Sequence, residues 1–140
     1  MEATTLTECR TLKSLLGDDW RDYAEAVEAG ETDIQCGDSR MIRGDEIDEV
    51  QRDELSDDTY MLGCFTGWFI ADHTPLSLDA VRRLQKAEQF EALGELMLIE
   101  IDDVQRDYVS ADGYGHHFNH EDFGEEEIEI DGVLWHVFVM

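Results

Sequence analysis

EIDEVQRD at residues 46–53 is repeated 54 residues later as EIDDVQRD at residues 100–107. The similarity extends beyond these octapeptides, because ten of the fifteen residues at 46–60 recur at 100–114. In each copy the apolar residues are spaced as on one face of a helix, and carboxylates fill the positions between them. The repeat therefore predicts two related amphipathic helices. Their expected inward residues are Ile47, Val50 and Leu55 in the first copy, and Ile101, Val104 and Tyr108 in the second.

The most apolar stretch of the chain, residues 59–71, lies between the two copies. Its apolar side chains are distributed almost all round a helix, so we expect a buried central helix with Cys64 as a core thiol. Gly63 and Gly67 lower the helix propensity but permit close packing. After the break at Thr74-Pro75, Ser77 is a candidate cap for helical residues 78–98, with a kink or interruption near residue 87.

The segments that flank this region predict a different structure. Residues 1–44 predict two helices that stop at Gly17 and Gly30, followed by a loop that includes a short strand at 39–42. In the tail, Asp131-Gly132 separates the runs 126–130 and 133–139 and is typical of a type I′ hairpin turn. Residues 114–120 are a candidate third strand.

The expected fold class is α+β, with about five or six helices around a buried central helix. A small C-terminal antiparallel hairpin or three-stranded sheet completes it. The length of 140 residues favours a single domain, 1–140. Within it we distinguish less acidic N-terminal helices (1–44), a helical core bounded by the repeat (45–110), and an acidic β-rich tail (111–140).

The charge of the chain is its most unusual property. There are 35 Asp and Glu residues against 10 Lys and Arg, which gives a formal net charge of −25. Direct binding to nucleic acid or to an anionic membrane requires clustered Lys and Arg, so this composition excludes both. It favours a basic protein surface or a multivalent cation as the partner.

The cysteines and the apolar runs indicate the compartment. Three cysteines, Cys9, Cys36 and Cys64, are an odd number without CxxC spacing, which favours reduced thiols. The N-terminus lacks the pattern of a signal peptide, and no apolar run approaches the length of a membrane span. We therefore expect a cytoplasmic protein. For the isolated His73 and His136 we expect structural roles.

The acidic residues are segregated along the chain. From residue 87 to residue 140 the only Lys or Arg is Arg106, against fifteen acids. Carboxylates at i, i+3 and i+7 form a row on a helix, with neighbours roughly 5–6 Å apart at Cβ, and duplex DNA carries a phosphate every ~3.4 Å per strand. Such rows could imitate a phosphate backbone. The residues we expect to bind a partner are Glu46, Glu49, Asp53, Glu100, Asp103, Asp107, Glu125, Glu126 and Glu127.

In size and composition the chain resembles the acidic DNA-mimic proteins of phages and plasmids that inhibit restriction enzymes and CRISPR effectors. The resemblance rests on overall charge and assigns no role to any residue. It implies a non-enzymatic inhibitor, without cofactor, that occupies the basic cleft of a DNA- or RNA-binding protein in the host cytoplasm. A homodimer that joins two acidic faces is left open.

Two alternatives remain at this point. Acidic composition is also typical of proteins adapted to a saline cytoplasm, whatever their function. The second alternative is a small metal-binding protein or metalloenzyme. His116, His117 and His120, followed by two acids, could ligate Zn²⁺, Ni²⁺ or Fe.

Overall fold

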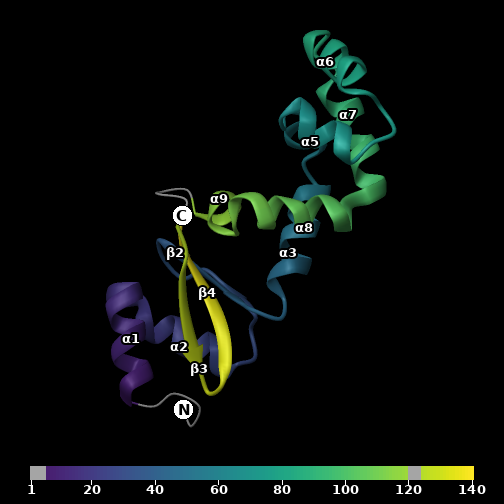
Figure 1. The fold of residues 1–140 in the computed structure, drawn as a ribbon. Coiled ribbons are helices and arrows are strands. Elements are labelled where there is room, and N and C mark those ends of the chain that lie inside the picture. Colours follow the sequence, from purple (N-terminus) through teal and green to yellow (C-terminus); the bar gives the residue numbers. More distant parts are fainter. Residues whose placement is uncertain (1–5, 120–123) are drawn as a thin grey trace. The chain divides into compact units, whose positions relative to one another are not determined.

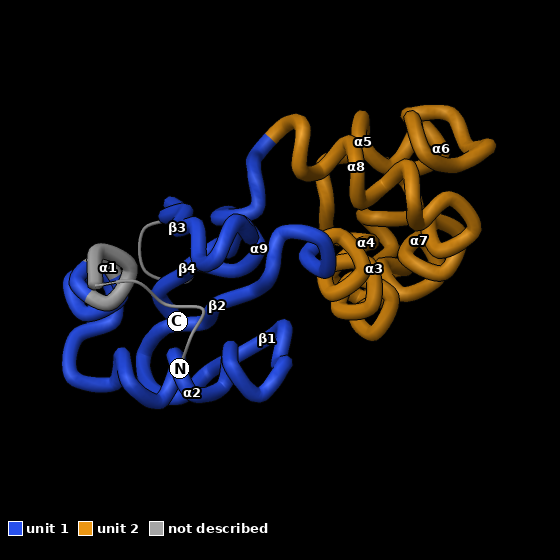
Figure 2. Tube along the Cα trace, turned by 90° about the horizontal axis from the view of Figure 1, so that it is seen from below, with its two compact units in different colours: residues 1–47, 112–140 blue, residues 48–111 orange. Residues whose placement is uncertain are grey.

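A computed structural model describes residues 6–119 and 124–140 (Figure 1). These residues form helices and one four-stranded antiparallel sheet, which confirms the expected α+β class. They divide into two compact units, coloured separately in Figure 2. Unit 1 comprises Met1–Ile47 and Asp112–Met140, and unit 2 comprises Asp48–Ala111. These limits lie close to the expected boundaries of the helical core, whereas behaviour as a single domain stays a prediction.

Unit 1 is built around the sheet, whose strand order is β1-β2-β4-β3. Its elements are α1 (Leu6–Leu16), the 3₁₀ turn η1 (Gly17–Asp19), α2 (Trp20–Glu28), β1 (Asp33–Ile34), β2 (Ser39–Arg43), α9 (Gly115–Phe118), β3 (Glu126–Ile130) and β4 (Val133–Val139). The hairpin β3–β4 has positive φ at Asp131 (52°) and Gly132 (79°), which is the geometry of the expected type I′ turn. β4 also pairs with β2, so strands from both ends of the chain form one sheet.

The prediction of a third strand at residues 114–120 is wrong. Residues 115–118 form the short helix α9 instead, and residue 120 lies outside the described residues. The sheet gains its further strands from the N-terminal segment, where β2 confirms the expected strand at 39–42. β2 is an inner strand, between β1 and β4, and its consecutive residues Met41 and Ile42 are both buried, so both faces of the strand are covered.

The two faces of the sheet have different coverings. On one face Met41, Trp135 and Val137 pack in a core with Leu12 of α1 and Tyr23 of α2. On the other face Ile42 and Phe138 are fully buried, and the ring of Phe138 lies 5.0 Å from that of Phe118 in α9. The same face carries His136, so helix α9 and strand β4 enclose a histidine.

Unit 2 is helical and has its own core. Its elements are α3 (Ile47–Ser56), α4 (Thr59–Gly63), α5 (Gly67–Asp72), α6 (Leu78–Lys86), α7 (Phe90–Met97), the 3₁₀ turn η2 (Leu98–Glu100) and α8 (Ile101–Asp112), with the outermost residues of α3 and α8 assigned to unit 1. Its buried residues are Leu55, Leu62, Ile70, Val81, Leu93, Met97, Val104 and Tyr108. None of the described helices is both long enough and apolar enough to cross a bilayer.

The prediction of a single buried helix at residues 59–71 is wrong. Two short helices, α4 and α5, replace it, and each begins at its own cap: Asp58 accepts a hydrogen bond from the backbone of Met61, and Thr66 accepts one from Phe69. Tyr60 and Trp68 are exposed by 57% and 63%, and the Cys64 thiol belongs to an exposed residue rather than to the core. The apolar residues of this stretch are therefore divided between two short helices, each of which is only partly buried.

Helices α4 and α7 touch backbone to backbone through two glycines. A Cβ atom on Gly63 would lie 1.8 Å from the carbonyl oxygen of Phe90, and one on Gly94 would lie 1.8 Å from that of Thr59. Both distances are far below van der Waals contact, and the obstructing atoms belong to the main chain. Neither position therefore has room for a side chain unless the helices separate.

The two repeat helices, α3 and α8, are joined by equivalent residues. Gln105 donates from Nε2 to Oε1 of Gln51 at 2.9 Å and to Oδ1 of Asp48 at 2.8 Å. Gln51 and Gln105 hold the same position in the repeat and are both buried. Nearby, Nε of Arg52 lies 3.3 Å from Oδ1 of Asp102. The repeat thus encodes two helices that pack against each other with their acids outward.

We expect Gly63→Ala to destabilise the protein by at least about 3 kcal/mol, because the new methyl group must push two helix backbones apart. Gly67→Ala is the matched control. Its Cβ would meet side chains and no main chain, with the nearest atom, on Leu78, at 3.1 Å. Alanine also favours the helix, so we expect a change of less than about 1 kcal/mol. Urea unfolding followed by circular dichroism measures both. Equal stability of Gly63→Ala and wild type would contradict the close approach of α4 and α7.

Candidate functional site

Three of the expected partner-binding acids of unit 2 are exposed and unpaired. Glu49 and Asp53 lie on α3, and Glu100 ends η2 just before α8. None of the three makes an ion pair with another described residue of the chain. Their charges are therefore available to a partner.

The other two expected acids of unit 2 are already engaged. Asp103 lies 2.5 Å from the Arg106 guanidinium, and Asp107 accepts from Nε2 of His73 at 2.7 Å. Arg106 stands between them in the row, 3.9 Å from Asp107. The arginine of the second copy therefore partly neutralises the acids of α8, and their binding to a partner stays a prediction.

The remaining expected acids belong to unit 1. Glu46 lies 3.6 Å from Arg43, which reduces its availability. Glu126 and Glu127 are exposed on β3, and Glu125 directly precedes that strand. Because strand side chains alternate, Glu125 and Glu127 share one face of the strand and Glu126 projects from the other.

A pocket in unit 2 brings acids together with apolar walls. Its volume is about 430 Å³, and it is lined by Asp72, His73, Thr74, Pro75, Leu96, Ile99, Glu100 and Asp103. Three of these residues are acidic, and Ile99 is 75% exposed at its edge. The sequence singled out Glu100 and Asp103 but missed Asp72. Only packing brings the α5–α6 connection beside η2 and α8.

The chemistry of this pocket suits a long basic side chain. The aliphatic part of a lysine or arginine can pack on Leu96, Ile99 and Pro75 while its charged end reaches a carboxylate. Charge-assisted hydrogen bonds to carboxylates are stronger than neutral ones, particularly for the planar guanidinium group. The pocket thus adds a specific acceptor for a basic side chain to the general negative charge of the surface.

His73 fixes one wall of the pocket, in agreement with the structural role expected for it. The residue is buried, its Nδ1 lies 2.7 Å from the carbonyl oxygen of Phe69, and its Nε2 lies 2.7 Å from Asp107. Both ring nitrogens therefore lie within hydrogen-bond distance of an oxygen atom, and the two contacts fix the orientation of the ring. This contact ties α8 to the end of α5.

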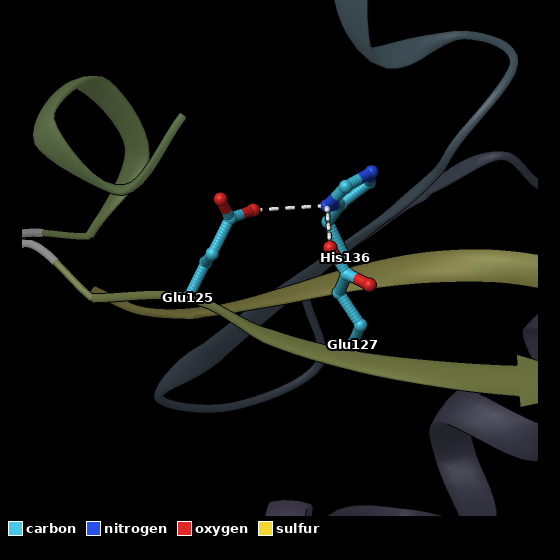
Figure 3. A group of neighbouring side chains, drawn as sticks. All are labelled: Glu125, Glu127 and His136. Carbon is cyan, nitrogen blue, oxygen red and sulfur yellow. Dashed lines mark hydrogen bonds and ion pairs between the residues drawn. The ribbon is translucent and has the colours of Figure 1, made fainter. Parts of the chain in front are cut away.

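The histidines expected to bind metal are only partly described. His116 is exposed and His117 half-buried on α9, and His120 lies outside the described residues, so this metal site stays a prediction. Among the described residues, the group with metal-ligand geometry is Glu125, Glu127 and His136, whose ligand atoms all lie within 4.8 Å of one another (Figure 3). Sequence reasoning missed this group. The alternation of β3 would have placed the two glutamates on one face, but the cross-strand register to His136 was not visible.

The surroundings of Cys36 disfavour its thiolate. Burial, together with the carboxylates of Asp22, Glu31 and Asp19, raises the pKa of the Cys36 thiol, because all of these disfavour the thiolate. A catalytic cysteine requires the opposite shift.

We expect Asp107→Ala to destabilise the protein by about 1 kcal/mol, because it leaves Nε2 of the buried His73 without its acceptor. The repeat provides the control, since Asp53 is the equivalent residue of the first copy and is exposed. Asp53→Ala should change the stability by less than about 0.5 kcal/mol. Thermal unfolding of both variants measures the difference, and equal effects would show that the His73 contact does not contribute.

The raised pKa of Cys36 predicts slow alkylation. At pH 8 the native thiol should react with iodoacetamide more slowly than the same residue in the urea-unfolded chain, and the rate should reach its plateau at higher pH. Peptide mass spectrometry at Cys36 measures the modification separately from that at the other cysteines. Faster reaction in the native chain than in the unfolded chain would contradict a raised pKa of the Cys36 thiol.

Comparisons with protein-family models, with curated proteins and with solved structures give no match for this chain.

Proposed function

We propose that this protein is a non-enzymatic inhibitor that imitates the negative charge of a nucleic acid and blocks the basic cleft of a DNA- or RNA-binding protein. We place its action in the cytoplasm. The observation that carries the proposal is the pocket of unit 2, where Asp72 and Glu100, together with Asp103 in its ion pair with Arg106, lie beside apolar walls that suit a lysine or arginine side chain. The exposed Glu49 and Asp53 supply further negative charge in the same unit.

The physical basis is the exchange of counterions. A protein that holds nucleic acid does so through Lys and Arg, and it releases condensed ions when it binds phosphates. An acidic protein surface with carboxylates outward offers the same basic cleft a similar source of favourable charge. Binding of this kind weakens steeply as salt rises, and added duplex DNA competes with it.

The acids of unit 2 are expected to contribute unequally to the free energy of binding. Exposed carboxylates outside the pocket, such as Glu49, contribute mainly to the long-range field, and each adds little by itself. A basic side chain inserted in the pocket is desolvated against Ile99 and Leu96, so its contact contributes more. We therefore regard the pocket as the centre of the interface and the surrounding acids as its charged margin.

The test is a pull-down from an extract of the source cells at about 0.1 M salt, in the range where surface charges act over about 10 Å. We expect wild type to retain a nucleic-acid-binding protein that duplex DNA or high salt releases. The triple variant Asp72→Lys, Glu100→Lys and Asp103→Lys should lose this retention, because it reverses the charge of the pocket.

The control variant is Asp79→Lys, Glu88→Lys and Glu91→Lys. It makes the same change in net charge at exposed residues of unit 2 outside the pocket, and we expect it to keep most of the binding. Circular dichroism establishes that both variants are folded. Equal loss in both would indicate that net charge alone decides binding, and normal binding by the pocket variant would refute the proposed interface.

A further inference from the structure

Strand pairing in unit 1 brings two glutamates and one histidine together. In the antiparallel pair β3–β4, Glu127 lies directly opposite His136. Glu125 precedes Glu127 by two residues and therefore lies on the same face. Figure 3 shows both carboxylates directed from the start of β3 toward the imidazole on β4. The three side chains converge because the register of the hairpin fixes them.

The imidazole is held in place by its surroundings. His136 is 6% exposed, and its ring lies 5.1 Å from that of Tyr114 and 6.3 Å from that of Phe138. On β4 it also pairs with Ile42 of β2, which is fully buried. Its Nδ1 is the atom that faces both carboxylates. A metal ligand of this kind is pre-organised, since little side-chain freedom remains to be lost on binding.

The distances between the His136 imidazole and the two carboxylates suit a shared metal ion better than a single hydrogen bond. Nδ1 lies 2.9 Å from Oε2 of Glu125 and 4.0 Å from Oε1 of Glu127. A single N–H can serve Glu125, but 4.0 Å is too long for a hydrogen bond to Glu127. Ligands held at about 2.0–2.2 Å in a tetrahedral site lie roughly 3.3–3.6 Å apart, which is between the two distances. Both glutamates are exposed, so their side chains are free to adjust to such spacing around an ion.

The local charge also favours a cation. The only Lys or Arg after residue 86 is Arg106, which belongs to unit 2. On the neighbouring strand β2, Arg40 pairs with Asp33, and Arg43 pairs with Asp45 and Glu46. Two carboxylates beside one imidazole nitrogen form a donor set that borderline divalent ions such as Zn²⁺ accept.

We propose that Glu125, Glu127 and His136 form a binding site for a divalent transition-metal ion such as Zn²⁺. Three protein ligands leave a coordination position for water or another ligand. The bound ion would tie residue 125 and β3 to β4 and neutralise two of the charges at this end of the sheet. The site is distinct from the histidines of residues 116–120, and it is independent of the function proposed for unit 2.

The experiment is titration of the full-length, metal-free protein with Zn²⁺ by isothermal calorimetry, with excess Mg²⁺ present to occupy non-specific carboxylates. We expect one equivalent of Zn²⁺ to bind wild type. Glu125→Gln combined with Glu127→Gln should weaken this binding at least tenfold, and His136→Gln should do the same. The glutamate variant keeps the buried residue intact, so it remains informative if His136→Gln fails to fold.

Two control variants make the result specific. Glu126→Gln combined with Glu129→Gln removes the same charge from the same strand and should retain the affinity of wild type. His116→Gln, His117→Gln and His120→Gln together should also retain it. Absence of a stoichiometric site in wild type, unchanged affinity in the Glu125 and Glu127 variant, or loss of binding in either control would overturn the proposal.

Discussion

The chain has 25 more negative than positive charges, and the structure of both units must accommodate this surplus. Self-repulsion at this charge opposes folding, and removing a carboxylate from water without a partner is costly. Each unit therefore keeps an apolar core and leaves its acids at the surface. Where a cation is available, it is used within the fold, as Arg106 is beside Asp103 and Arg52 is beside Asp102.

The repeat organises unit 2 within this constraint. Its buried glutamines pair with each other, and its apolar residues enter the core, so the acids of α3 and α8 lie at the surface, where Asp48 and Asp107 also bind buried side chains. The backbone contact between α4 and α7 holds two further helices of the unit together. One result is a pocket in which acids of the second copy meet a loop that carries Asp72. The functional proposal depends on this pocket more than on the total charge.

The same surplus charge leads to different chemistry in unit 1. Along β3 the acids alternate with Ile128 and Ile130, which are buried in the core. The face that carries Glu125 and Glu127 meets a buried histidine across the hairpin. In unit 2 a partner's basic side chain is the cation that we propose, and in unit 1 it is a metal ion. Both proposals follow from carboxylates that lack sufficient cations of their own.

Periodicity and turn chemistry in the sequence determined the α+β class, the two repeat helices and the β3–β4 hairpin, because these signals are local. The sequence also identified Glu49, Asp53 and Glu100 as exposed acids. It did not predict the break between α4 and α5. An apolar run such as residues 59–71 is compatible with one buried helix or with two shorter helices that each bury one side. Only the tertiary structure decided that Asp72 joins Glu100, that His73 engages Asp107, and that His136 lies opposite Glu127. Those contacts depend on packing and strand register between residues far apart in the chain, which local patterns do not encode.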